Sequence, residues 1–178
     1  MSTNNYQEFV KRVEKGDAPI RVEPAAGRKF FTDTAHSTIK GKVGESLLIE
    51  RLLVKTCWLL GYACLIAAMI ASVFALKWYS IIVTPIILIA FILLSGEASV
   101  GKQRILDTVF LMVICVLLAD YFKDKGISML VWLVLLPLPY FFIRLTYKLA
   151  TMFLRSLSIR NEKAFNLLYG KRIFLEEE

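Results

Sequence analysis

Apolar residues gather in four long runs between residues 56 and 143. The first run has 21 residues without a charge, and the other three have 17 or 18 residues each. A hydrocarbon core of about 30 Å requires roughly 17–25 helical residues to cross it. The pattern therefore predicts an all-α integral membrane protein with four transmembrane helices, at residues 56–76, 79–95, 105–122 and 127–143.

Prolines interrupt two of these runs, at Pro85 and at the pair Pro137 and Pro139. Such prolines end many helices in water, but in a membrane they are tolerated as kinks where neighbouring groups satisfy the freed carbonyls. A buried core in a soluble α-protein is the alternative interpretation. Four apolar runs in fewer than ninety residues leave almost no polar face to meet water, so the pattern favours the membrane.

The segments on either side of the runs have a different pattern, and we expect residues 1–55 and 144–178 to form cytoplasmic extensions of a transmembrane domain at 56–143. Residues 4–15 predict a short amphipathic helix, and 16–44 are rich in the Gly, Pro and Thr typical of a loop. Residues 44–56 resume helical periodicity and should continue directly into the first run. After residue 144 the pattern stays helical. It fits an amphipathic helix on the lipid surface or a stalk that binds its own copies or a cytosolic partner.

Composition agrees with the membrane prediction. Hydrophobic residues make up 57% of the chain and the mean hydropathy is +0.58, against about 45–50% apolar residues in soluble domains. The net charge of +7 belongs mainly to the two flanks, which hold 17 of the 22 Lys and Arg residues. Anionic lipid is therefore the expected partner, and no nucleic acid is expected.

Lys and Arg also predict the orientation, since they concentrate on the cytoplasmic side of membranes. Ten of them lie near the N-terminal approach, the second loop and the exit, whereas three lie on the opposite side. Both termini should face the cytoplasm, with a bacterial inner or plasma membrane as the location. The basic residues expected to contact headgroups or a partner are Arg51, Lys55, Lys102, Arg104, Lys148 and Arg155.

The second cytoplasmic loop resembles a phosphate-binding loop in its letters, because "GEASVGK" at residues 96–102 spells G-x-x-x-x-G-K. Gln103 stands where such a loop needs a Ser or Thr for magnesium. The preceding run is long enough to be a membrane helix rather than a strand. We therefore expect a basic turn between two membrane helices and no nucleotide site.

Small residues recur every four positions in the first run, which is how helices approach closely in lipid. We predict that these rows mediate tight helix packing and form the seam of a homo-oligomer, with packing inside one protomer as the alternative. The residues are Ala63, Ala67, Ala71 and Ala75 in one row, and Cys64, Ala68 and Ser72 in the other.

Charges at the ends of the runs form the second candidate site. Asp107 and Arg144 are predicted at the same membrane face, where they could pair, and Asp120 lies near the other face. Intramembrane ionisable groups are functional hypotheses by default. Local ion pairs at the interface and a conduction path lined by these acids are both consistent with the sequence.

No Ser, Cys, His or carboxylate set has the spacing of a catalytic or metal site, so we predict no enzyme, no cofactor and no metal. The leading hypothesis is an oligomeric, non-enzymatic subunit that forms a pore or anchors and signals to cytosolic partners, as small effector or defence-system components do. The alternatives are a small ion or proton channel or transporter that uses Asp107 and the Pro-kinked helices, and a membrane enzyme acting on lipid headgroups.

Overall fold

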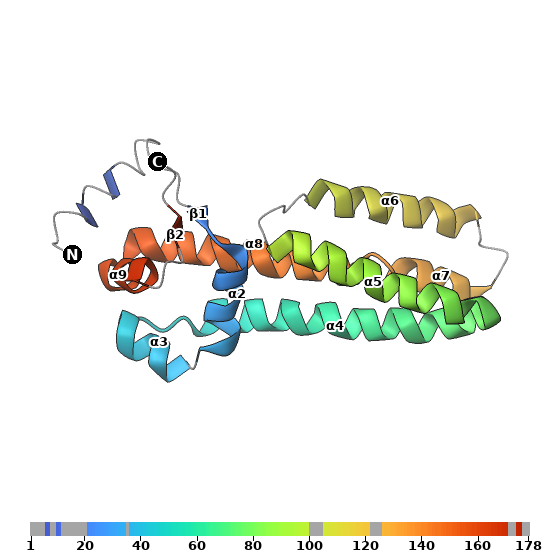
Figure 1. Cartoon of the computed structure of the whole chain (residues 1–178), viewed down its shortest axis with the longest axis horizontal. Helices are drawn as coiled ribbons and strands as arrows, with labels where there is room; N and C mark the ends of the chain where they lie inside the picture. The colour runs from blue at the N-terminus through green and yellow to red at the C-terminus, as the bar shows by residue number, and fades with distance from the viewer. Residues whose placement is uncertain are drawn as a thin grey trace. The chain divides into compact units, whose positions relative to one another are not determined.

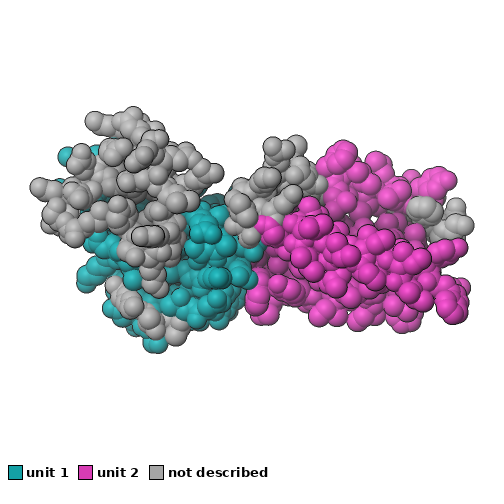
Figure 2. Space-filling view, viewed as in Figure 1, with its two compact units in different colours: residues 1–55, 147–178 teal, residues 56–146 magenta. Residues whose placement is uncertain are grey.

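A computed structural model of the chain describes residues 6–7, 10–11, 21–34, 36–99, 105–121, 126–170 and 174–175. Apart from one pairing of two-residue strands, all regular elements of these residues are helices, so the all-α prediction is confirmed. The chain divides into two compact units, which Figure 2 shows in different colours. Residues 1–55 and 147–178 form the flanking unit, and residues 56–146 form the apolar unit.

The flanking unit combines elements from both ends of the chain (Figure 1). Its N-terminal part contains β1 (Arg21–Val22), α2 (Pro24–Asp33), α3 (His36–Val43) and the start of α4 (Leu48–Leu76). Its C-terminal part contains the end of α8 (Leu138–Arg160), α9 (Glu162–Gly170) and β2 (Phe174–Leu175). β1 and β2 pair antiparallel, with Arg21 opposite Leu175.

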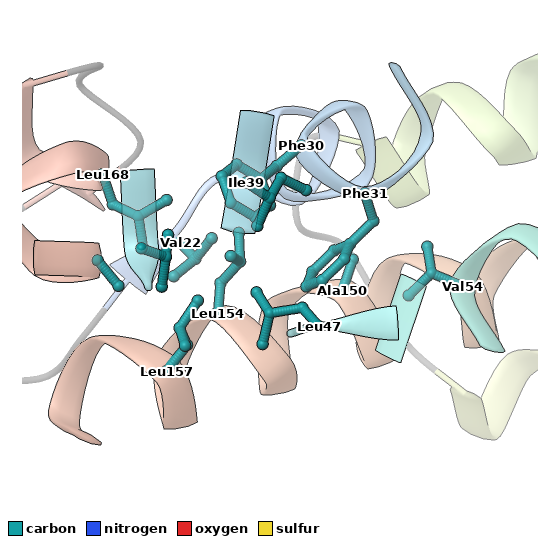
Figure 3. Packing of buried hydrophobic residues seen from close by; sticks show 12 residues of the cluster. Val22, Phe30, Phe31, Ile39, Leu47, Val54, Ala150, Leu154, Leu157 and Leu168 are labelled. Atoms are coloured by element: carbon teal, nitrogen blue, oxygen red, sulfur yellow. The ribbon is translucent and has the colours of Figure 1, made fainter. Parts of the chain in front are cut away.

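A shared hydrophobic core holds the flanking unit together (Figure 3). Fully burying a large apolar side chain contributes about 1.5–3 kcal/mol relative to leaving it in water. Phe31 packs edge-on against Phe30 and Phe153, with ring centroids 5.3 and 6.2 Å away. The buried members are Val22, Phe30, Phe31, Ile39, Val43, Leu47, Val54, Ala150, Leu154, Leu157, Ala164 and Leu168.

The loop predicted for residues 16–44 is wrong over its described part, because α2 and α3 lie there. Pro24 occupies the first turn of α2, where a proline costs no hydrogen bond. Gly27 lies inside α2, where an added Cβ would be 3.4 Å from the Leu154 side chain, and Gly44 ends α3 with a φ of 82°. The residues that suggested a loop therefore start, pack and stop helices. Of the helix predicted at 4–15, only Tyr6–Gln7 and Val10–Lys11 are described, as helix, and the rest lies outside the described residues.

The apolar unit begins with two antiparallel helices. α4 extends from Leu48 to Leu76, so the helix expected before the first apolar run continues into that run but begins at Leu48 rather than at residue 44. The chain then reverses through the 3-10 turn η1 (Lys77–Tyr79) into α5 (Ser80–Ser99) (Figure 1). Ser72 and Thr84 share a hydrogen bond of 2.9 Å near the turn, and the rings of Tyr62 and Phe91 meet at 5.8 Å further along.

The remaining helices of the apolar unit are α6 (Ile105–Tyr121), α7 (Ile127–Leu135) and the first part of α8. α6 lies against α7. The ring of Tyr140 on α8 lies 5.9 Å from that of Phe91 on α5, and its hydroxyl donates a hydrogen bond of 3.5 Å to the Ile87 carbonyl.

The fourth apolar run contains a break rather than a simple kink. α7 ends at Leu135, two turn residues follow, and α8 starts at Leu138 with Pro139 in its first turn. α8 then passes through Arg144, where the apolar run ends, and continues to Arg160. The charge at residue 144 ends the apolar pattern without ending the helix.

Two helical stretches of the described chain are long and apolar enough to cross a membrane. Leu48–Gly96, which contains α4, η1 and most of α5, has an apolar window with a mean hydropathy of 2.3, and Ile127–Arg160 has one of 1.8. Only 28% and 33% of these windows are buried within the chain. Most of the apolar surface of both stretches therefore faces outward.

Candidate functional site

α4 has one buried face and one exposed face, and these faces define the first candidate site. The buried face within the apolar unit contains Gly61, Leu65, Ala68 and Ser72, which recur at helical spacing. At Gly61 an added Cβ would lie 3.0 Å from the Cγ1 and Cδ1 atoms of Ile143, so α4 and α8 approach closely there. The opposite face is apolar and exposed from Leu48 to Phe74.

The two predicted small-residue rows lie at different places on this helix. In the second row Ala68 and Ser72 are fully buried within the chain, and Cys64 is half-buried. The Ser72 hydroxyl reaches Thr84 on α5 and donates to the Met69 carbonyl at 2.7 Å. In the first row Ala63 is exposed, whereas Ala67, Ala71 and Ala75 are half-buried. The second row therefore serves packing within the chain, and the first row borders the exposed face.

The predicted intramembrane charges are only partly described. Arg144 is 5% exposed and lies beside Phe91, Ser95 and Tyr140. Asp120 is exposed near the end of α6. Asp107 belongs to α6, but its side chain lies outside the described residues, so its pairing with Arg144 stays a prediction.

The structure likewise describes only some of the predicted basic contacts, namely Arg51, Lys55, Lys148 and Arg155. Arg51 is turned inward, and its Nε donates a 3.2 Å hydrogen bond to the carbonyl of Phe31 in the last turn of α2, where a cation is favourable. Lys148 and Arg155 lie exposed on α8, and Lys55 is half-buried. Lys102 and Arg104 lie outside the described residues. Arg51 thus stabilises a helix end of the flanking unit.

A polar cluster between the two ends of the chain was missed by the sequence analysis. Glu45 accepts hydrogen bonds of 2.9 Å from Arg160 Nη2 and from Asn161 Nδ2. Asn161 Nδ2 also donates to the Val43 carbonyl at 3.1 Å, and its Oδ1 accepts from the Ala164 amide in the first turn of α9. This cluster joins the α3–α4 loop to the α8–α9 junction. No local pattern signals it, because 116 residues separate Glu45 from Asn161.

Two aromatic side chains make further contacts within the flanking unit. The Tyr6 hydroxyl donates a 2.6 Å hydrogen bond to the Ile159 carbonyl, and its ring lies 5.5 Å from that of Phe165. Burial and the nearby negative charge of Glu162 both raise the pKa of Tyr6, which favours the protonated phenol that donates this hydrogen bond. The Arg28 guanidinium lies 6.0 Å from the centre of the Tyr147 ring.

The phosphate-loop resemblance fails structurally where it is described. Gly96–Ser99 form the last turn of α5, so the first four positions of the motif are helical and cannot present their amides to a phosphate as a loop would. Residues 100–104 lie outside the described residues. Cys57, Cys64 and Cys115 are free thiols. Among the described residues, no three His, Cys, Asp or Glu side chains gather as metal ligands.

No family model, curated protein or solved structure matches the chain.

Proposed function

We propose that the chain is a polytopic plasma-membrane protein that crosses the bilayer four times and acts without catalysis, as the membrane anchor of a folded, cytoplasmic flanking unit that signals to or recruits a cytosolic protein. The observation that carries the proposal is that the two apolar stretches leave most of their surface exposed, whereas a soluble protein buries such residues. Their mean hydropathies are 2.3 and 1.8, yet about 70% of each window is left unburied by the chain. A core helix of a soluble protein would bury most of such a surface, whereas lipid covers it at no cost.

The shared core of the flanking unit supports an even number of crossings. Residues 1–55 and 147–178 contribute to one hydrophobic cluster, so both segments must lie on the same side of any membrane. The reversal between α4 and α5 already accounts for two antiparallel apolar helices. α6 supplies a third crossing and, with 17 residues, is short for a bilayer, and the α7–α8 stretch Ile127–Arg160 supplies a fourth.

The flanking unit also supports an anchoring role over a purely intramembrane one. It is a folded body with its own core and carries exposed basic side chains at Lys29, Lys40, Lys148, Arg155 and Lys163. Such charges suit anionic headgroups or an acidic face of a cytosolic partner.

Site-directed thiol labelling tests this topology in membranes that contain the full chain. In a background without native cysteines, Trp78→Cys and Tyr121→Cys should react with a membrane-impermeant maleimide from outside. Gly96→Cys and Met152→Cys should react only after permeabilisation. All four positions are exposed in the structure. Extraction of the chain by alkaline carbonate, or labelling of Gly96→Cys from outside, would overturn the four-crossing proposal.

A leakage assay separates the anchor from a pore. The purified chain in vesicles should retain a small entrapped dye at the level of empty vesicles. Dye release that depends on protein concentration would instead identify a pore-forming subunit. Proton flux abolished by Asp107→Asn would identify the channel alternative.

A further inference from the structure

The exposed face of α4 is longer than a bilayer is thick, and this excess is informative. It extends from Leu48 to Phe74, which corresponds to roughly 40 Å at 1.5 Å per residue, against a hydrocarbon core of about 30 Å. Trp58 lies about 27 Å along the helix from the end of α4 at Leu76, and Trp78 and Tyr79 follow in the turn η1, so aromatic residues stand near both ends of this stretch, as they do at the two interfaces of a membrane. Residues 48–53 therefore lie outside the hydrocarbon core.

This overhanging part is apolar and open. Leu48, Ile49, Leu52 and Leu53 are 57, 69, 64 and 45% exposed. Water-facing apolar clusters of this kind mark interaction sites. The charged residues of the same turns, Glu50, Arg51 and Lys55, are all half-buried and lie off this face.

The face also has the periodicity of a coiled coil. Eight exposed residues alternate in steps of three and four, as the a and d positions of a heptad repeat do. Any apolar face of a helix has such steps, so the identity of the residues at these positions, rather than their spacing, points to a helical partner. The repeat is informative mainly at Ile49 and Leu52, where the exposed Leu48 and Leu53 flank the pair and the charged Glu50 and Arg51 are half-buried. The eight positions are Ile49, Leu52, Thr56, Leu59, Ala63, Ile66, Ile70 and Val73.

We propose that this face binds the same face of a second copy of the chain, so that two α4 helices pair in parallel along a two-fold axis. The proposal rests on the membrane topology proposed above, because two copies inserted in the same way place α4 in the same direction. Ile49 and Thr56 at a, with Leu52 and Leu59 at d, match the β-branched and Leu pattern that favours two strands. Ala63 at the next a position lets the backbones approach closely inside the membrane. The seam therefore has the first small-residue row at its border. It also includes two turns of α4 that lie outside the bilayer.

Disulfide trapping in membranes with the full chain tests the pairing. In a background without native cysteines, Leu52→Cys should form an interchain disulfide under mild oxidation. The matched control is Met152→Cys, which is 51% exposed on α8 of the same flanking unit. We expect at least tenfold more covalent dimer for Leu52→Cys than for the control. Equal yields for the two variants would overturn the proposal.

A second measurement covers the case in which the thiol is badly oriented. The mass of the detergent-solubilised particle should correspond to two chains, and Leu52→Glu should halve it, whereas Met152→Glu should not. A single-chain mass for the unaltered protein would overturn the pairing. If Leu52→Cys is shielded from a water-soluble maleimide while the mass is that of one chain, lipid or another protein covers the face and the pairing is wrong. Carbonate extraction reports separately on membrane insertion, so failure of the pairing and failure of the topology are distinguishable.

Discussion

At the scale of single residues, the packing of the flanking unit depends on side chains such as Leu154. This leucine is fully buried, and its Cδ1 is the nearest heavy atom to the position of a Cβ on Gly27. Leu154→Ala should lower the free energy of unfolding of the flanking unit by about 2–5 kcal/mol, because it leaves a cavity in a closed core. Met152→Ala, two residues away and exposed, should change it by no more than about 0.5 kcal/mol. Hydrogen exchange of the α9 amides during denaturation in detergent measures the free energy of unfolding of both variants. Equal losses for the two variants would contradict the burial of Leu154 in the shared core.

Asn161 is a polar residue whose removal should have a large effect in this unit. It caps α9 through Ala164 and donates to the Val43 carbonyl and to Glu45. Asn161→Ala should cost about 1–2 kcal/mol, because it removes the cap and two donated hydrogen bonds. Asn161→Asp keeps the cap acceptor but places a second carboxylate beside Glu45. It should therefore recover stability as pH falls below 5, whereas Asn161→Ala should show no such recovery in thermal denaturation curves.

The difference between Leu154 and Asn161 also shows what sequence can predict at this scale. Apolar residues recur at helical spacing on the C-terminal helices, as predicted, and Leu157, Ala164 and Leu168 among them are buried, because burial on a helix repeats every three or four residues. Asn161 has no such pattern, and its role depends on Val43 and Glu45, which no local signal connects to it. Arg51 was predicted as an external contact for the same reason, since its acceptor is a backbone carbonyl of α2.

At the scale of elements, α4 and α8 meet at Gly61. An added Cβ there would lie 3.0 Å from Ile143, whereas Gly41 in α3 has nothing within 4 Å of that position. Gly61→Leu should therefore destabilise the apolar unit by about 1–3 kcal/mol through overpacking. Gly41→Leu should leave the protein as stable or slightly more stable, because it replaces a helix-interior glycine. Thermal stability of the purified chain in one detergent compares the two, and the same sign for both would contradict the helix contact.

The helices themselves were largely predictable, and their ends were less so. The apolar runs predicted helical segments that the described α4, α5 and α6 resemble closely. α8 differs, because the predicted boundary at Arg144 reflects hydropathy and not hydrogen bonding, and the helix continues to Arg160. α2 and α3 were missed because Pro24, Gly27 and Gly44 are read as breakers in sequence, although each has a specific place in or after a helix.

At the scale of the whole molecule, the union of the two chain ends is the feature that sequence did not reveal. Val22 to Val54 and Ala150 to Leu168 contribute to a single cluster, although about a hundred residues separate them. Each half has apolar residues at helical spacing, but the pattern alone does not say what each half packs against. The C-terminal helix was consequently expected on the lipid surface or as a stalk, whereas its buried face packs on α2 and α3 side chains.

A charge placed in this shared core should release both chain ends together. Phe31 is fully buried between Phe30 and Phe153, so Phe31→Asp puts an unpaired carboxylate in an apolar site at a cost of several kcal/mol. Limited proteolysis of membranes should then cut the N-terminal and the C-terminal segment at the same protease concentration, at least tenfold below that needed for the unaltered chain. Under the proposed topology the apolar unit should remain in the membrane, because Phe31 does not belong to it. Lys29→Asp, an exposed position on the same helix, is the control and should leave the proteolysis pattern unchanged. If Phe31→Asp exposes only the N-terminal segment, α8 and α9 are held by contacts other than the shared core, and the two ends fold independently.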